Sequence, residues 1–390
     1  MFFNQKCFCI IILLSEINVF CVANRRVKTM ELKNRIKAFD KLGEVLRNVD
    51  DVNFLNALQK PSLREKALSL NALIQSVQYH NGWFTPSMVT HALKALGEGL
   101  YLDKLEKWLD PYDQSRFESI QPKTVAVIMA GNVPAVGFHD FLSVLITGNK
   151  LLGKLSSEDD RLLPAIADVL TAIEPGFKPF IELTDQVISG FDAVIATGSN
   201  NSARYFEYYF GKYPSIIRKN RNGVAVLTGR EEGEGLERLA DDVFLYYGLG
   251  CRNVAKLFVP RSYDFKPLLK VLEARKEMTD HQKYYNNYEY NKALYLVNKT
   301  PHFDTGNLLI TESSSFSSPV SVLYYTFYDG EQALKNELML SRDQIQCVVS
   351  SADFIENKVP FGQSQFPELW DYADGVDTIR FLTDLNQREK

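Results

Sequence analysis

The sequence predicts an α/β protein with two domains built on mostly parallel sheets and preceded by a helical segment. Three observations predict this class. A chain of 390 residues is too long for one small core and suits two α/β domains. Its 45% apolar and 24% charged residues are typical of a globular body. From residue 125 onward, short apolar runs of strand length alternate with segments of helical periodicity.

The first 29 residues need a separate interpretation. Residues 7–22 form an apolar run that is short for a membrane-spanning helix, and no stable membrane insertion is expected. The run is compatible with a weak signal peptide that ends near Ala23, or with a tethered protein. The favoured alternative is an extension ahead of a true start at Met30, because Met30 opens an amphipathic helix.

Charge and cysteine usage exclude several classes of protein. The formal net charge is −4 and no block of five or more Lys or Arg occurs, so no nucleic-acid partner is predicted. Three of the five cysteines lie in the first 29 residues, which leaves Cys251 and Cys347. Two cysteines form neither a disulfide framework nor a zinc site, and the histidines show no metal spacing. We therefore expect no metal site and a reducing, cytoplasmic compartment.

Three ranges divide the rest of the chain. Residues 30–241 are expected to hold N-terminal helices, up to about residue 120, and then a first parallel sheet. Residues 242–355 form a second α/β unit, and residues 356–390 a segment that packs back on the body. Right-handed strand-helix-strand connections predict open sheets that bind ligands at the carboxyl ends of their strands.

The individual elements follow from local patterns. The apolar run 125–130 predicts a parallel strand covered on both faces. After the turn 131–134, helical periodicity extends from Phe138 to Ile146, and Gly148 occupies the position of a left-handed C-cap. Further strands are expected at 150–155, 191–196, 224–227, 257–259, 294–297, 320–325 and 345–349, helices at 162–173 and 202–210, and a serine-rich loop at 313–318.

Cys251 carries the strongest chemical signal. It lies between Gly250 and Arg252, just before an expected strand. A thiolate is the best intrinsic protein nucleophile, close glycines let the backbone approach a substrate, and the Cys251 N–H can point at a developing oxyanion. Arg252 is expected to lower the pKa of the thiol. A buried structural cysteine is the alternative interpretation.

Two turns at strand ends supply further candidates. Asn132 follows the strand 125–130, and its amide can donate to an oxyanion, although an ordinary turn residue would look the same. The turn Thr197-Gly198-Ser199 has small residues suited to a phosphate at a helix N-terminus, and a helix cap explains it equally well. Neither a G-x-G-x-x-G motif nor a Walker loop occurs.

The order of these motifs resembles the aldehyde dehydrogenase superfamily, and within it the LuxC-like acyl-CoA reductases. The resemblance covers nearly everything from about residue 83 to the end. The similar segments are the oxyanion turn at 130–134, the adenosine-ribose segment at 148–158, the pyrophosphate turn at 197–199, the nucleophile loop at 248–251 and a Pro-Phe-Gly stretch at 360–364.

This resemblance implies roles for particular residues. Residues 30–241 would bind a nicotinamide cofactor, and residues 242–355 would carry the catalytic cysteine. Cys251 would be the nucleophile and Asn132 the oxyanion donor. The implied cofactor ligands are Lys154, Ser156, Ser157, Thr197, Gly198, Ser199 and Glu312.

Three departures from the superfamily pattern bear on the expected reaction. The stretch 217–221, which matches the Glu base of aldehyde-oxidising relatives, contains no carboxylate, so reduction is favoured over hydrolysis of an acyl-enzyme. Ser157 stands where NAD-preferring relatives often have Glu, which favours NADPH, with NADH possible because Glu158 is adjacent. The segment after Glu312 departs from the pattern Glu-x-Phe-Gly-Pro, which weakens its equivalence to the nicotinamide-ribose ligand.

The sequence thus predicts an NAD(P)H-dependent reductase that converts a fatty acyl thioester into an aldehyde through Cys251. The donor is an acyl-CoA or an acyl-protein thioester, and a homo-oligomer is possible. Two alternatives stay open. An aldehyde-oxidising dehydrogenase of the same fold would need the base that 217–221 lacks. A non-catalytic acyl-binding protein would have no need to keep Cys251, Asn132 and Lys154 together.

Overall fold

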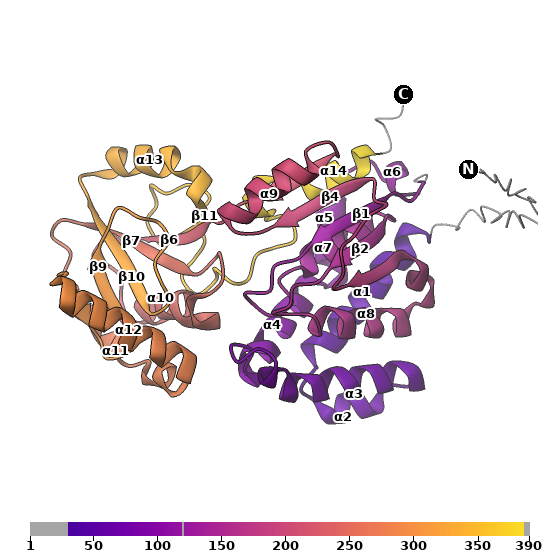
Figure 1. Ribbon diagram of the computed structural model, residues 1–390, viewed down its shortest axis with the longest axis horizontal. Coiled ribbons are helices and arrows are strands. Elements are labelled where there is room, and N and C mark those ends of the chain that lie inside the picture. Colours follow the sequence, from indigo (N-terminus) through magenta and orange to yellow (C-terminus); the bar gives the residue numbers. More distant parts are fainter. Residues whose placement is uncertain (1–29, 119–120, 386–390) are drawn as a thin grey trace, which may run out of the picture.

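The computed structural model describes residues 30–118 and 121–385, so the interpretations of residues 1–29 fall outside it. The chain forms two lobes that lie side by side, each built around its own sheet (Figure 1). In the described part of the chain, no helix is long and apolar enough to cross a bilayer. The expected class, with mostly parallel sheets and an N-terminal helical segment, is confirmed.

The first lobe contains a five-stranded sheet in which every pairing is parallel. Its order is β3-β2-β1-β4-β5. The strands are β1 (Thr124–Ile128), β2 (Lys150–Lys154), β3 (Ile181–Thr184), β4 (Ala193–Thr197) and β5 (Ser215–Arg218). Because β1 pairs with β2 on one side and β4 on the other, the strand order reverses between β1 and β4. A crevice at the carboxyl ends of two such strands is where open α/β sheets bind ligands.

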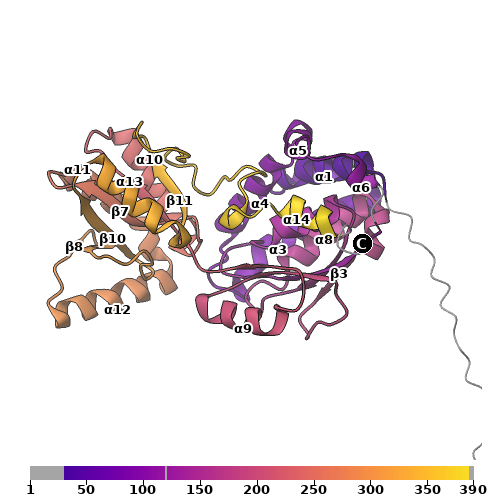
Figure 2. The same cartoon turned by 90° about the horizontal axis from the view of Figure 1, so that it is seen from above.

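Alternate residues of β1 face the two layers that cover this sheet. Val125 and Val127 belong to the large core on the side of the N-terminal helices, whereas Ala126 packs with Val194 on the opposite face, which α9 covers (Figure 2). A period of two is what a strand covered on both faces requires. The helices of this lobe are α1 (Leu32–Arg47), α2 (Val52–Ala57), α3 (Pro61–Ser76), α4 (Pro86–Gly99), α5 (Leu102–Leu109), α6 (Ser115–Glu118), α7 (Phe138–Ile146), α8 (Leu162–Ile173) and α9 (Asn200–Phe210).

The second lobe contains a six-stranded sheet of order β11-β6-β7-β10-β9-β8. All its pairings are parallel except that of β8 with β9. The strands are β6 (Asn222–Val226), β7 (Val254–Pro260), β8 (Phe303–Asp304), β9 (Leu309–Glu312), β10 (Val322–Tyr328) and β11 (Ile345–Ser350). The helices are α10 (Gly233–Phe244), α11 (Lys266–Glu273), α12 (Gln282–Asn298) and α13 (Glu331–Leu340).

Two expectations about individual strands were wrong. The segment 294–297 lies in α12 instead of a strand, and its Val297 is 81% exposed. A short apolar run does not distinguish helix from strand by periodicity alone. The strand at 224–227 exists as β6, but it pairs with β7 and β11 in the second sheet. The chain therefore passes between the sheets before Asn222, ahead of the boundary expected at residue 242.

The chain after β11 returns from the second lobe to the first (Figure 1). The carboxylate of Asp242 fixes the start of this return segment by accepting hydrogen bonds from the N–H of Gly362 at 2.7 Å and of Ser364 at 2.9 Å. Gly362 has a φ of +79°, a conformation that favours glycine. At the far end, α14 (Thr378–Asp384) packs on α7 of the first lobe.

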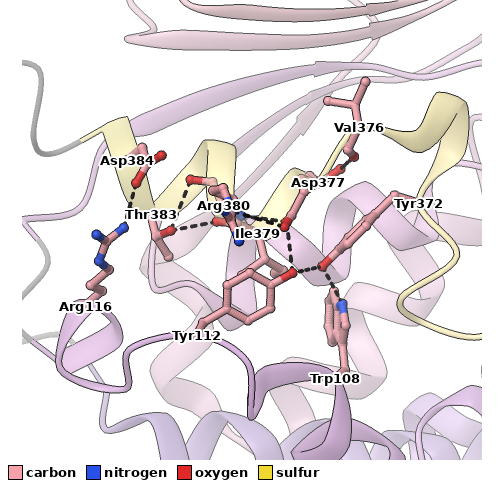
Figure 3. A network of polar contacts seen from close by, with 11 residues as sticks. Trp108, Tyr112, Arg116, Tyr372, Val376, Asp377, Ile379, Arg380, Thr383 and Asp384 are labelled. Carbon is pink, nitrogen blue, oxygen red and sulfur yellow. Dashed lines mark hydrogen bonds and ion pairs between the residues drawn. The ribbon is translucent and has the colours of Figure 1, made fainter.

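A directed chain of hydrogen bonds holds the return segment on the first lobe (Figure 3). The Trp108 indole donates to the Tyr372 hydroxyl at 2.7 Å. The Tyr112 hydroxyl donates to the Asp377 carboxylate at 2.9 Å, so the 2.7 Å contact between the two hydroxyls must be donated by Tyr372. Burial raises the pKa of Tyr112 to about 12, which keeps this phenol protonated and able to donate.

We predict that Tyr112→Phe weakens this attachment without creating a cavity, because the aromatic ring is kept. The substitution removes one hydroxyl that bonds both Tyr372 and Asp377, so the free energy of unfolding should fall by about 1–2 kcal/mol. Urea denaturation followed by tyrosine and tryptophan fluorescence measures the change. Tyr79→Phe is the matched control, because Tyr79 is 83% exposed, and an equal loss in both variants would contradict the assignment.

Candidate active site

A cavity of about 260 Å³ lies where the two lobes meet. One wall is α4 and the start of α7, a second is the loop that carries Cys251, and a third is the return segment around Phe366. The cavity also reaches the carboxyl ends of β1 and β4, at Met129 and Thr197. Most of its lining is apolar, including Ala92, Ala95, Leu96, Gly99, Val133 and Phe138.

The loop before Cys251 has an unusual backbone. Tyr246, Tyr247 and Gly248 have φ values of +52°, +59° and +74°, so three consecutive residues are left-handed. Bulky residues adopt this conformation at a cost of roughly 1–3 kcal/mol each, and such strain persists only where the surroundings impose it. The strain therefore identifies this loop as a segment with a fixed shape.

The amide of the buried Asn253 imposes that shape. Its Nδ2 donates to the carbonyls of Asp242 at 3.0 Å and Leu245 at 2.8 Å, and its Oδ1 accepts from the Gly250 N–H at 2.8 Å. Asn253 is 2% exposed, so these bonds are shielded from water. One side chain thus connects both ends of the strained turn and fixes the position of the backbone at Cys251.

Cys251 is exposed as a residue and lines the cavity. Removal of water from around the sulfur raises the pKa of the Cys251 thiol, and nearby Asp374 adds to this effect. Arg252 and Arg218 act in the opposite direction. The expected lowering by Arg252 is thus present, but the effect of burial outweighs it, and the thiol is protonated at neutral pH.

The Asn132 side chain lies against the Cys251 loop. Its Nδ2 donates to the Leu249 carbonyl at 2.7 Å, which joins the turn after β1 to the segment just before the cysteine. This partner was not expected, because the sequence only indicated an oxyanion donor. An amide has two N–H groups, so one remains for a ligand.

Arg218 occupies the stretch where the sequence lacks a carboxylate. It ends β5, is 6% exposed and lines the same cavity as Cys251. Its guanidinium donates to the Asp140 carboxylate at 2.5 Å and to the Thr378 hydroxyl at 3.1 Å. Sequence reasoning missed this buried pair. The only signal was a charged residue directly after Ile216 and Ile217.

Other carboxylates that line the cavity also have partners. Glu368 forms an ion pair with Lys104 at 2.9 Å. Asp371 accepts a hydrogen bond from the Glu368 N–H at 3.3 Å.

His139, which also lines the cavity, has its Nε2 2.9 Å from the Leu369 carbonyl, so this nitrogen donates a hydrogen bond. Burial lowers the pKa of the His139 imidazole.

The residues expected to bind the cofactor gather at the carboxyl edge of the first sheet. Lys154 ends β2, and its Nζ donates to the Leu155 carbonyl at 3.1 Å. Ser156 is half-buried and Ser157 is exposed in the turn that follows. Thr197 ends β4, and Gly198 and Ser199 lead into α9.

Ser199 caps α9, which is the ordinary structural explanation for such a turn. Its hydroxyl accepts from the Ser202 N–H at 3.2 Å. A Cβ at Gly198 would lie 2.8 Å from the Ser202 Cβ and 2.9 Å from the ring of Phe206, so only glycine lets the helix approach this closely. The first turn of α9 thus presents its N–H groups close to the end of β4.

Glu312 lies apart from this group. It is exposed at the end of β9 in the second lobe and pairs in register with Tyr325. It is not among the residues that line the Cys251 cavity. Within residues 30–118 and 121–385, no group of three or more His, Cys, Asp or Glu side chains could hold a metal ion.

Solved structures with a similar fold include aldehyde dehydrogenases. Aldehyde dehydrogenase 21 of Physcomitrella patens, solved with succinate, matches with a TM-score of 0.59 and 10% identity, over 92% of this chain and 85% of that one. An acetylating aldehyde dehydrogenase of Geobacillus thermoglucosidasius matches with a TM-score of 0.55 and 13% identity, over 84% and 78%. Indole-3-acetaldehyde dehydrogenase of P. syringae, solved with NAD⁺, gives 0.51 and 15%, over 83% and 72%. At these identities the likeness establishes the fold.

The chain thus has an aldehyde dehydrogenase-like fold. The sequence pattern of the acyl-CoA reductase (LuxC) family matches residues 40–266, which is more than half of the chain. The chain belongs to the LuxC acyl-CoA reductase family, and it is an oxidoreductase that acts on an acyl or aldehyde group. No curated protein matches it.

The electrostatics of Cys251 predict how its alkylation depends on pH. Because burial raises the pKa of the thiol, the iodoacetamide rate should keep increasing through about pH 9.5, roughly one unit above the ordinary cysteine value, where an ordinary cysteine approaches its plateau. Arg252→Gln should slow alkylation at pH 7.5 by roughly two- to fivefold, since it removes a cation that favours the thiolate. Peptide mass spectrometry measures the rates. Arg342→Gln is the control, and a faster Arg252→Gln variant would contradict this account.

Proposed function

We propose that the protein reduces an acyl-CoA thioester, with a fatty acyl chain, to an aldehyde through an acyl-enzyme on Cys251. The observation that carries this proposal is an accessible thiol on a fixed loop that faces a mostly apolar cavity. Membership of the acyl-CoA reductase family supports the same reaction. An acyl-protein thioester is a second form of the donor.

The first step is attack of the Cys251 sulfur on the thioester carbonyl, with CoA as the leaving thiol. The thiol proton goes to the departing thiolate or to solvent, so the step balances. The tetrahedral oxyanion would accept hydrogen bonds from the Cys251 N–H and from the second N–H of Asn132. Removing one donor of this kind typically lowers turnover by about 10²–10³-fold.

The surroundings of Cys251 favour a long-lived acyl-enzyme. A water molecule attacks such a thioester efficiently only when a free base activates it. Two of the carboxylates that line the cavity are engaged by cations, Asp140 by Arg218 and Glu368 by Lys104, which leaves Asp371 without a cation partner among the described residues. Arg218 also stands in the stretch where oxidising relatives place their base, and a guanidinium cannot accept a proton from water. Hydrolysis, the step that completes aldehyde oxidation, is therefore disfavoured.

The carboxyl edge of the first sheet fits a nicotinamide cofactor. Lys154, Ser156 and the first turn of α9 offer donors for ribose and phosphate oxygens, and the cavity reaches this edge at Thr197. A cofactor bound there would supply the hydride that converts the acyl group into an aldehyde. Exposed Ser157 leaves room for a 2′-phosphate, which favours NADPH, while neighbouring Glu158 keeps NADH possible.

A turnover assay with the purified full chain tests this function. Acyl-CoA and NADPH should give free CoA, aldehyde and oxidised cofactor, and Cys251→Ala should abolish all three. Cys347→Ala is the matched control and should retain most activity, because Cys347 is buried with its thiol 3.8 Å from the Arg252 carbonyl and a pKa raised to about 11. Faster turnover of aldehyde with oxidised cofactor than of thioester would favour the oxidising alternative.

The cavity predicts which residue limits the acyl chain. Gly99 ends α4 in the cavity wall, and a Cβ there would meet only the Leu369 side chain, at an ordinary 3.7 Å. Gly99→Leu should therefore fill space without straining the helix. For the longest accepted chain, kcat/KM should fall by about tenfold or more, with little change for short chains. Glu98→Leu is the exposed control on the same helix, and uniform losses over all lengths would contradict this prediction.

A further inference from the structure

The turn that carries Asn132 is held in a strained conformation by a carboxylate. Ala135 has a φ of +53°, although it has a side chain and is 3% exposed. The Asp159 Oδ2 accepts the Ala135 N–H at 2.7 Å, and Oδ1 accepts the Leu162 N–H at 3.3 Å. The bonded N–H belongs to the strained residue itself, so Asp159 acts directly on the shape of the turn.

The same turn lies between the expected cofactor segment and the Cys251 loop. On one side, a Cβ at Gly131 would lie 2.6 Å from the Ser156 Oγ and 2.9 Å from the Glu158 Cβ, so the backbone of the turn lies close against these two side chains. On the other side, Asn132 bonds the Leu249 carbonyl at 2.7 Å. A displacement of the segment 156–159 therefore has a contiguous route to the loop that carries the thiol.

Asp159 is a buried carboxyl without a cation paired to it among the described residues. It is 8% exposed, and burial raises its pKa to about 6, while the N–H donors of Ala135 and Leu162 act in the opposite direction. Neighbouring Asp160 raises it further, and Arg161 lies 3.6 Å from Asp160. A structural hydrogen bond alone would not need a charge in this place, because a neutral amide also accepts N–H groups.

We propose that Asp159 is a positioning residue that couples the cofactor segment 156–159 to Cys251 through the Asn132 turn. The inference rests on the proposed function, since it assigns a role within that same site. When its carboxylate is ionised, it holds the Ala135 N–H in a charge-assisted hydrogen bond. Binding of the cofactor at the segment 156–159 then changes how readily a reagent reaches the Cys251 thiol.

The sign of the pH dependence follows from the raised pKa. Above about pH 6 Asp159 is ionised and the coupling is complete, and below it the protonated carboxyl is a weaker acceptor. The contribution of Asp159 to the free energy of unfolding depends on pH in the opposite direction. The folded chain holds this proton more tightly than the unfolded chain, so the contribution of Asp159 to stability is lost as pH rises from 3.8 to about 6. Coupling and stability therefore change in opposite directions.

The test is the rate of iodoacetamide alkylation at Cys251, measured with and without saturating NADPH at pH 5.5 and pH 8. The ratio of the two rates cancels the titration of the thiol itself. At pH 8 NADPH should change the wild-type rate by about fivefold or more, and at pH 5.5, where most of the Asp159 carboxyl is protonated, the ratio should fall to about half that value or less. In Asp159→Asn the ratio should be near one at both pH values, while NADPH fluorescence still reports binding.

Asp160→Asn is the matched control, because it removes an adjacent exposed carboxylate that does not contact the turn. This variant should keep the wild-type ratio of alkylation rates at pH 8. The pH at which the ratio changes should be slightly lower, because Asp160 raises the pKa of Asp159. Asp159→Asn should be at least as stable as wild type at pH 7, whereas a purely structural residue would lose stability and leave the ratio intact. If the variant does not fold, the wild-type pH series titrates the same carboxyl without a substitution.

Three results would overturn the proposal: a wild-type ratio in Asp159→Asn, a wild-type ratio independent of pH between 5.5 and 8, or loss of the ratio in Asp160→Asn. The proposed reaction fails separately. If acyl-CoA is not reduced but the ratios behave as described, the coupling stands and the reaction is wrong. If acyl-CoA is reduced without any coupling, the reaction stands and Asp159 has another role.

Discussion

The side chain of Asn253 holds both ends of the loop that precedes Cys251, and the rest of the site depends on this arrangement. Its amide bonds the carbonyl of Leu245 on one side of the left-handed turn and the N–H of Gly250 on the other. Without these bonds, two tyrosines have no reason to remain at positive φ. The position of the sulfur, the contact from Asn132 and the shape of the cavity all follow from where this loop is fixed.

The charges around the cavity have a second effect. Taking a guanidinium out of water is costly unless it is paired, and Arg218 is paired with Asp140. The pair removes a carboxylate from use as a base, and around Cys251 the cations Arg252 and Arg218 favour the thiolate, whereas burial and Asp374 disfavour it. In the proposed function the thiol reacts with an acyl group, and two of the carboxylates near the product, Asp140 and Glu368, are engaged by cations.

The sequence allowed much of the fold and part of the site to be predicted. The helix 162–173 and the left-handed Gly148 were predicted correctly, because capping and helical periodicity are local properties. The sheet to which β6 belongs could not be predicted, since an apolar run does not identify its pairing partner. Arg218 and Asp140 are separated by 78 positions, so their ion pair exists only after folding. The contact of Asn132 with the Leu249 carbonyl was hidden for the same reason.

The most direct test of the account is the mass of the protein after incubation with an acyl-CoA in the absence of any nicotinamide cofactor. We predict one acyl group per chain, located by peptide mapping on Cys251 and removed by neutral hydroxylamine, as a thioester requires. An acyl group on Cys347, on a hydroxyl or on no residue at all would contradict the central claim that the fixed loop presents a reactive thiol to a bound acyl donor.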